Sequence, residues 1–352
     1  MAQITVMGAG ILGLTAAWAM ARRGATVRLI EAERVGAGSS GGIVGALAPH
    51  VPEQWNAKKQ FQFESLLMAE AFWQEVAQAG GRDPGYARLG RVQPLGDEPA
   101  VERARDRGVN AETLWQGRAA WRVVPGDTIG GMRVASATGL VIHDTLSARM
   151  RPRGAAEALV AALATKGVSV ERGRAPPAGV VLWATGVQGL RDLGAALDRP
   201  MGGGVKGQAA LFAADFSRVP QVFGDSLHVV PHADGTVAVG STSEREYDDP
   251  AGTDAQLDAL IAQARALCPD LCAAPLLERW AGVRPRSPSR APMLGGWPGR
   301  PGHYVLNGGF KIGFGMAPKL AELAADLLLD GEDRVPEGFR VTDNLKGAQK
   351  AG

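Results

Sequence analysis

The chain has 352 residues, of which 45% are hydrophobic and 21% charged, and its formal net charge is +2. This size allows two joined domains and a sizeable core. The near-neutral charge offers no electrostatic basis for binding nucleic acid. Residues 4–20 are apolar, but no Lys or Arg precedes them and glycines interrupt them, which argues against a signal peptide. No run reaches the ~18–20 apolar residues of a membrane span, so we expect a cytoplasmic protein.

Residues 4–30 read as a strand, a glycine-rich turn, a helix and a second strand. Residues 4–7 and 25–30 are short apolar runs rich in β-branched side chains, as in buried strands. Residues 14–23 are Ala-rich and predicted helical, and Gly24 ends them. This order is typical of a Rossmann-type unit that binds a dinucleotide.

The glycines of this turn each meet a steric need. Gly8 allows the tight turn, Gly10 lets a pyrophosphate approach the backbone, and Gly13 lets the helix pack closely on the strand. The start of the helix then offers free N–H groups to phosphates. Glu31, about 20 residues further on, can accept from ribose hydroxyls and repels the 2′-phosphate of NADP. NAD and FAD remain, and a glycine-rich turn of another α/β protein is the alternative.

A glycine- and serine-rich loop, residues 36–45, follows this acid. Its glycine density and its hydroxyl and N–H donors favour close approach to a ligand, with a solvated loop as the alternative. A nicotinamide enzyme more often enters another helix at this point, so the loop favours FAD.

The glycine turn, segment 31–40 and the following Gly-Ala-Leu-Ala-Pro-His together resemble the D-amino acid oxidase superfamily, closest to its glycine oxidase and sarcosine oxidase branch. The resemblance implies an α/β fold (α+β overall), with a Rossmann-type FAD-binding domain and a mainly antiparallel β-sheet substrate domain. We assign residues 1–80, 144–195 and 280–352 to the first domain, and 81–143 and 196–279 to the second. The FAD contacts implied in the first part of the chain are Gly8, Gly10, Ile11, Leu12, Gly13, Glu31, Ala32, Ser39, Ser40, Gly45, Ala46 and Leu47.

The middle of the chain holds a continuous apolar run at 180–183, typical of a buried parallel strand. Its Ala-Thr-Gly end resembles the second flavin-contacting strand of the superfamily. The β-meander that relatives carry before this strand is replaced by a short segment, which predicts a trimmed nucleotide end. We also predict helices at 57–78 and 154–166 and strands at 86–95 and 168–170, leave 101–124 unassigned, and expect FAD contacts from Val170, Ala184, Thr185 and Gly186.

Residues 206–212, 227–231 and 236–241 alternate like half-buried antiparallel strands, and the Asp-Gly pair at 234–235 predicts a hairpin turn. The resemblance places the substrate over such a sheet. His228, Tyr247 and His232 are therefore pocket candidates. A satisfied residue of the sheet is the alternative for His228, and His232, beside the turn, is expected to be solvent-exposed.

Two cysteines, Cys268 and Cys272, lie four residues apart in an Ala/Leu-rich stretch. This spacing predicts one face of a helix and two buried free thiols. Since no histidine accompanies them, we expect no metal site.

A C-terminal block resembles the amine-oxidase branch: residues 280–285, then 292–296, then 304–318, then an Ala/Leu-rich helix at 319–329. Arg284 can hold a carboxylate with two parallel hydrogen bonds. The resemblance makes it the substrate anchor, and a structural pairing with an internal acid is the alternative. The flavin ring would lie near Arg284, Gly308, Gly309, Phe310, Lys311, Ile312 and Gly313. The resemblance makes Lys311 a basic residue of the pocket wall that assists anion binding, and an outward-pointing side chain is the alternative.

Three departures from the family pattern bear on the chemistry. Ser289 and Arg290 replace an acid after the Arg-Pro turn. Covalent-flavin branches carry a cysteine shortly after the arginine, in a region that Arg286 and Ser287 occupy here, so we expect non-covalent FAD. A lysine that helps flavin react with oxygen in some relatives is absent near Ala238, which leaves a dehydrogenase with another acceptor as an alternative to an oxidase.

The reaction we expect is FAD-dependent oxidative deamination or dehydrogenation of a small amine or amino acid, by hydride transfer to flavin N5. Arg284 would fix the substrate. His50 is our first candidate for the proton acceptor, with a packing role as the alternative. Dehydrogenation of a 2-hydroxy acid and a non-catalytic FAD-binding subunit are the rival functions. We expect a small-molecule substrate and no nucleic-acid partner. For the assembly, a homo-oligomer and a monomer are the alternatives.

Overall fold

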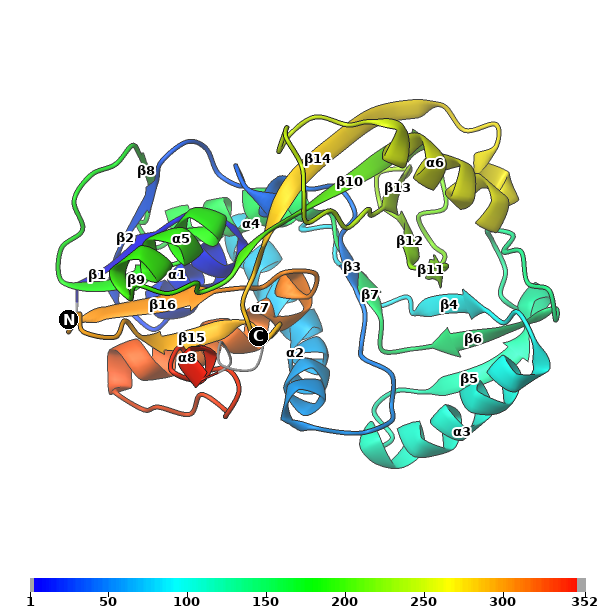
Figure 1. Cartoon of the computed structure of the whole chain (residues 1–352), viewed down its shortest axis with the longest axis horizontal. Helices are drawn as coiled ribbons and strands as arrows, with labels where there is room; N and C mark the ends of the chain where they lie inside the picture. The colour runs from blue at the N-terminus through cyan, green and yellow to red at the C-terminus, as the bar shows by residue number, and fades with distance from the viewer. Residues whose placement is uncertain (1–2, 347–352) are drawn as a thin grey trace.

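The computed structural model describes residues 3–346 and contains two large β-sheets (Figure 1). The first sheet is parallel throughout except for one antiparallel edge strand, β15. It confirms the Rossmann-type unit, and its third predicted strand begins at Val170 instead of residue 168. Its strand order is β15 (Met293–Gly296), β16 (His303–Asn307), β9 (Val180–Trp183), β1 (Gln3–Met7), β2 (Thr26–Glu31) and β8 (Val170–Arg172).

Helix α1 (Ile11–Arg22) is the central packing element of this part. Every residue of α1 before Arg22 is buried, because its Ala-rich sequence lets neighbours approach on all sides. It packs on α7 (Gly313–Ala325) and α4 (Pro152–Ala164), and α2 (Ala57–Gly80) packs on both of these. Helix α5 (Gly186–Ala196) follows β9 directly and contacts β16. The predicted long helix at 57–78 and the helix at 154–166 are confirmed.

The second sheet is antiparallel except for the pairing of β11 with β4. The predicted hairpin is confirmed, with a left-handed Gly235 (φ +79°) in its turn. Helix α6 (Ala255–Leu267) covers one face through an apolar cluster, and α3 (Glu98–Leu114) packs on the edge strand β5. The strand order is β14 (Leu276–Arg286), β10 (Gly203–Ala213), β13 (Thr236–Gly240), β12 (Leu227–Pro231), β11 (Gln221–Gly224), β4 (Arg91–Pro94), β6 (Leu140–Asp144) and β5 (Trp121–Pro125).

Strands β10 and β14 run side by side from the second sheet toward the first (Figure 1). The domain boundary that we predict at residue 280 falls inside β14. The assignment of segments to two domains stays a prediction, and its ends, residues 1–2 and 347–352, lie outside the described residues.

Two predictions about side-chain exposure are wrong. His232 is only 2% exposed, because its ring lies 3.2 Å from Thr236 Oγ1 and 3.3 Å from Val44 O, which is distant in sequence. Cys272 is exposed whereas Cys268 is buried. Helix α6 ends at Leu267 and a 3₁₀ turn follows, so the two thiols do not share a helix face.

Other element boundaries also differ from the prediction. The strand expected at 86–95 is confined to β4, and the unassigned stretch 101–124 holds most of α3 and the start of β5. The C-terminal helix begins at Gly313, six residues before the predicted start at 319, directly after the glycine loop. Between residues 3 and 346, no helix is long and apolar enough to cross a membrane.

Candidate active site

The glycine turn between β1 and α1 touches the end of β9. Gly8 has a left-handed φ of +103°, and a Cβ there would lie 2.5 Å from Ala184 O. A Cβ on Gly13 would overlap the carbonyl oxygen of Gly8. These positions accept no side chain, because the atoms that they would meet are backbone. Two segments predicted to bind FAD are thus in contact.

The side chains of Glu31 and Ser40 both contact this glycine turn. Glu31 Oε2 accepts from Ala9 N at 2.7 Å, and its Oε1 accepts from Glu33 N at 3.0 Å. Ser40 Oγ accepts from Ile11 N at 2.9 Å, one of the N–H groups at the helix start that have no partner within the helix. The carboxylate and the hydroxyl therefore lie beside the glycine turn, where the sequence predicts contacts to a ribose and a pyrophosphate. Ala32 is exposed after β2, and Val170 pairs with Leu29.

At Gly45, a second pair of backbone segments passes close together. Its φ is +67°, and a Cβ would lie 2.9 Å from the carbonyl carbon of Met150. The following strand, β3 (Ala46–Leu47), pairs with β7 (Ala148–Arg149). This pairing leads the chain from the glycine loop toward the eight-stranded sheet, where Gln221 contacts Leu47 O at 3.5 Å.

The loop from Gly308 to Gly313 faces α1 and α5. A Cβ on Gly309 would lie 3.0 Å from Gly313 Cα and 3.5 Å from Leu12 Cδ1. Asn307, which the sequence analysis missed, holds the loop: its Nδ2 donates to Gly186 O at 2.8 Å and its Oδ1 accepts from Gly308 N at 2.7 Å. The glycine turn, the end of β9 and this loop therefore converge.

These convergent segments fit a dinucleotide cofactor. Their facing surfaces are backbone and glycine, which allow a planar ligand to approach closely. Thr185, at the start of α5, has a buried hydroxyl with no hydrogen-bond partner within residues 3–346. Such an orphaned group is expected where a ligand supplies the partner. In the described chain, no group of three or more His, Cys, Asp or Glu side chains could hold a metal ion.

Arg284 lies on β14 with its guanidinium over the neighbouring strand. Its Nη1 donates to Ser241 Oγ at 2.7 Å, and its Nη2 donates to Thr242 O at 2.6 Å and Lys206 O at 3.1 Å. Nε is buried without a partner among the described residues. Burial lowers the pKa of Arg284 to about 10, and the charge of Glu244 opposes this shift. Arg284 thus stays charged at neutral pH.

The pairing register places His228 on the same sheet face as Arg284. Val205 pairs with Arg284, and four residues along the same strand Ala209 pairs with Gly240, which also pairs with His228. The His228 ring packs on Phe223 with centroids 4.6 Å apart. Burial, followed by the charges of Arg91 and Lys311, lowers its pKa to about 3. His228 is therefore a neutral imidazole at physiological pH.

Phe310, in the loop from Gly308 to Gly313, contacts the end of β14. Its N–H donates to Pro285 O at 3.0 Å, and its φ is +43°. Three cations surround its ring, with Arg284 Cζ at 5.7 Å and Arg286 Cζ and Lys311 Nζ at 5.8 Å from the centroid. Lys311 is an exposed residue, but its ammonium group is partly buried. This burial, together with the charge of Arg284, lowers the pKa of Lys311. This arrangement suits an anionic ligand.

Two other predicted site residues contact groups other than Arg284. The backbone N and the ring Nδ1 of His50 both engage Gln62 Oε1, and burial lowers the His50 pKa. The Tyr247 hydroxyl lies 2.7 Å from the place of a Cβ on Gly204, which faces away from Arg284 on β10.

The fold and the converging glycine segments define a dinucleotide-dependent enzyme, and comparison with known proteins makes this specific. The chain belongs to the FAD dependent oxidoreductase family, whose model matches residues 3–327. This membership confirms the resemblance found in the sequence, the oxidoreductase class and FAD as the cofactor.

Individual relatives cover nearly the whole chain. A glycine oxidase of Pseudomonas aeruginosa is 29% identical over 369 residues, which span 93% of this chain and 94% of the relative. A putative thiamine biosynthesis oxidoreductase of Rhizobium etli is 29% identical over 342 residues (93% and 97%).

Solved structures share the fold at lower identity. The glycine oxidase from Geobacillus kaustophilus matches with a TM-score of 0.82 at 22% identity, over 97% of this chain and 99% of that one. The iminodiacetate oxidase from Chelativorans sp. BNC1 matches with a TM-score of 0.82 at 21% identity, over 96% and 98%. Both likenesses support the α/β architecture described above.

Proposed function

We propose that this oxidoreductase oxidises a small amine or amino acid whose carboxylate is held by Arg284. The observation that carries the proposal is the oriented guanidinium on the sheet face beside the Phe310 loop. The names of relatives, glycine oxidase and iminodiacetate oxidase, point to the same class of substrate.

FAD would be held by groups that the chain already orients. The N-terminus of α1 and Ser40 suit the pyrophosphate, and Glu31 suits the ribose hydroxyls. Backbone N–H groups of the loop at 308–313 would face the flavin pyrimidine ring, beside Lys311. When bound, FAD supplies the acceptor for the hydride that leaves the substrate α-carbon.

Arg284 would bind and orient the substrate. A carboxylate would accept from the N–H groups that the contacts with Ser241, Thr242 and Lys206 leave free, Nε and one hydrogen of Nη1, and this fixes the position of the α-carbon relative to the sheet. Burial strengthens this attraction because little water screens it. The substrate nitrogen must be neutral before oxidation. His228, a neutral imidazole on the same face, joins His50 as a candidate to accept its proton.

The reaction class can be tested on the purified protein reconstituted with FAD. It is mixed without oxygen with glycine, sarcosine, D-amino acids, proline and 2-hydroxy acids while the flavin absorbance is recorded. We expect an amine to bleach the band, and Arg284→Gln to slow bleaching by an amino acid far more than by an amine without a carboxylate. Bleaching by hydroxy acids alone would establish the rival 2-hydroxy acid dehydrogenase. Admitting air then separates an oxidase from a dehydrogenase.

The remaining assignments are also proposals. Non-covalent FAD is supported by the position of Cys268, which packs under α6 in an apolar cluster with Ala210, on the sheet face opposite Arg284. Release of flavin from the denatured protein tests it. A cytoplasmic location and a homo-oligomer are proposed with it, and light scattering of the purified holoenzyme tests the latter.

A further inference from the structure

Thr242 connects side chains on opposite faces of the eight-stranded sheet. Its carbonyl oxygen accepts from Arg284 Nη2 at 2.6 Å, on the face that looks toward Phe310. Its hydroxyl donates to Glu244 Oε1 and accepts from Gln208 N at 2.8 Å. Since Val205 shares a face with Arg284, the side chain of Gln208 points to the other face.

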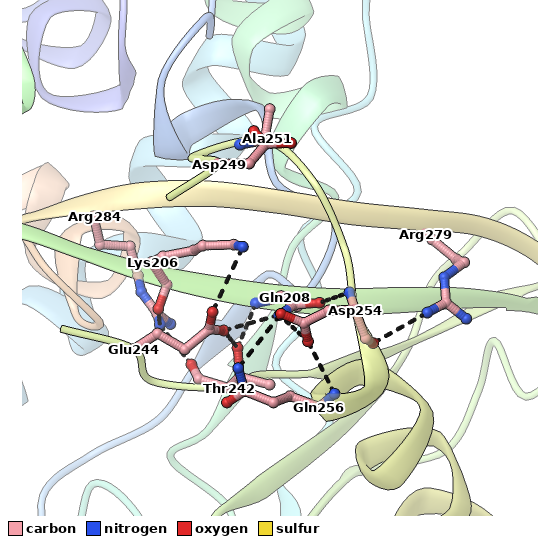
Figure 2. Close-up of polar contacts among 10 residues, drawn as sticks. All are labelled: Lys206, Gln208, Thr242, Glu244, Asp249, Ala251, Asp254, Gln256, Arg279 and Arg284. Atoms are coloured by element: carbon pink, nitrogen blue, oxygen red, sulfur yellow. Dashed lines mark hydrogen bonds and ion pairs between the residues drawn. The ribbon is translucent and has the colours of Figure 1, made fainter. Parts of the chain in front are cut away.

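Glu244 contacts Thr242, Gln208 and Lys206, and Figure 2 draws these contacts. Besides the Thr242 hydroxyl, its Oε1 accepts from Gln208 Nε2 at 3.1 Å, and its Oε2 lies 3.6 Å from Lys206 Nζ. Glu244 and these two partners are buried: Glu244 is 8%, Lys206 4% and Gln208 0% exposed. A buried carboxylate is tolerated only with such partners. Together with the backbone pairing of Lys206 and Glu244, it therefore fastens residues 242–244 to strand β10, which runs beneath Arg284.

Gln208 extends the same network to a rigid element. Its Nε2 also donates to Asp254 Oδ1 at 2.9 Å, and its Oε1 accepts from Asp254 N at 2.9 Å. Asp254 caps α6 by accepting from Gln256 N at 2.9 Å. Both ends of the segment between Thr242 and Asp254 are thus tied to one buried residue, Gln208: Thr242 to its backbone N–H and Asp254 to its side-chain amide, as Figure 2 shows.

We propose that Thr242, held by Glu244 and Gln208, is a positioning residue that sets the direction of the Arg284 guanidinium. The proposal deepens the proposed function, because it rests on Arg284 as the carboxylate anchor. Thr242 O and Lys206 O occupy Nη2, and Ser241 occupies Nη1, so the plane of the guanidinium is fixed before a ligand arrives. Such a geometry must be held to about 0.5 Å to be productive. A change in the backbone at Thr242 therefore turns the anchor.

The test uses the holoenzyme and two probes of equal shape, acetate and neutral acetamide, titrated against the flavin absorbance. Thr242→Val keeps the shape and removes the hydroxyl, and Thr242→Ser restores it. Ser243→Ala is the matched control, because Ser243 is an exposed neighbour. We expect Thr242→Val to weaken acetate binding roughly tenfold. Acetamide and FAD binding should stay within about twofold, and Thr242→Ser and Ser243→Ala should resemble the wild type.

Acetate binding unchanged in Thr242→Val, or acetate and acetamide weakened equally, overturns the proposal. The variant Arg284→Gln distinguishes failure of the Thr242 positioning role from failure of the proposed function. If this variant binds acetate like the wild type, or if the wild type does not bind acetate, Arg284 is not the anchor and both fail. If Arg284→Gln abolishes acetate binding and Thr242→Val does not weaken it, only the positioning role fails. Should Thr242→Val not fold, Thr242→Ala, which places no methyl group beside Glu244, decides by the same outcomes.

Discussion

The guanidinium of Arg284 lies directly over Gly207, where a Cβ would come within 2.5 Å of its Cζ. Gly207 pairs with Gly282, so neither strand puts a side chain at this point. The space allows Arg284 to fold back across β10 and reach Ser241 and Thr242. A glycine in mid-strand usually weakens a sheet, and close approach of another group is one reason for its presence.

Gly207→Ala should therefore displace the anchor. Because the clashing group is the end of a flexible side chain, we expect a small loss of stability, below about 1 kcal/mol, and a much larger functional loss. Acetate affinity of the holoenzyme, measured by flavin absorbance, should fall at least roughly tenfold. Gly203→Ala is the control, since no atom lies within 4 Å of the Cβ it would add to the same strand. Equal acetate affinities for the two variants would contradict the role of Gly207.

Gly13→Ala should act on the cofactor. Its Cβ would overlap the carbonyl oxygen of Gly8, and backbone cannot rotate away as a side chain can. We expect destabilisation of about 1–3 kcal/mol and at least roughly tenfold weaker FAD binding, because the helix must move away from the turn. Fluorescence titration of the apoprotein with FAD gives the affinity, and urea unfolding gives the stability. Gly96→Ala, with no neighbour within 4 Å, is the control; normal FAD binding in Gly13→Ala would refute the close-packing argument.

Local sterics explain which features could be predicted from the sequence. The turn at Gly8, the buried strand β9 and the hairpin at Gly235 depend on neighbours in the chain, and the structure has each of them. The Glu31 carboxylate also follows from spacing, because β1 and β2 are adjacent parallel strands. Patterns whose cause is local can be recognised in one sequence.

Partners distant in sequence explain what could not be predicted. His232 is buried by Val44, and Asn307 acts through Gly186. Thr242 matters only because the register of β10 brings Gln208 beside it. Nothing in a single sequence specifies such pairings before the strands are aligned.

Asp144→Asn should destabilise the eight-stranded sheet. Asp144 is fully buried and accepts from Arg91 Nε at 2.9 Å, and Arg91 is 5% exposed. The variant leaves the arginine charge buried without its counter-ion, which costs about 3–5 kcal/mol. Glu278→Gln, which breaks the exposed Arg153–Glu278 pair, should cost less than about 1 kcal/mol. Urea unfolding of both variants is the measurement, and similar losses would show that burial does not decide the cost.

Stability should depend on the titration of His228. Its pKa is lowered from 6.5 to about 3, so below pH 6.5 the unfolded chain takes up a proton that the folded chain does not. Folding stability therefore falls as the pH falls, by about 1.4 kcal/mol per pH unit for this group. Between pH 6.5 and 5, the wild type should lose about 2 kcal/mol more than His228→Gln.

Urea unfolding of the two proteins at a series of pH values, with saturating FAD, measures this difference. Between pH 7.5 and 8.5 the imidazole is neutral in both states, so the gap between the proteins should be constant there and serves as the control. Parallel profiles down to pH 5 would mean that His228 titrates normally in the folded protein. Its environment would then be hydrated, and a role as the neutral imidazole beside the substrate would lose its physical basis.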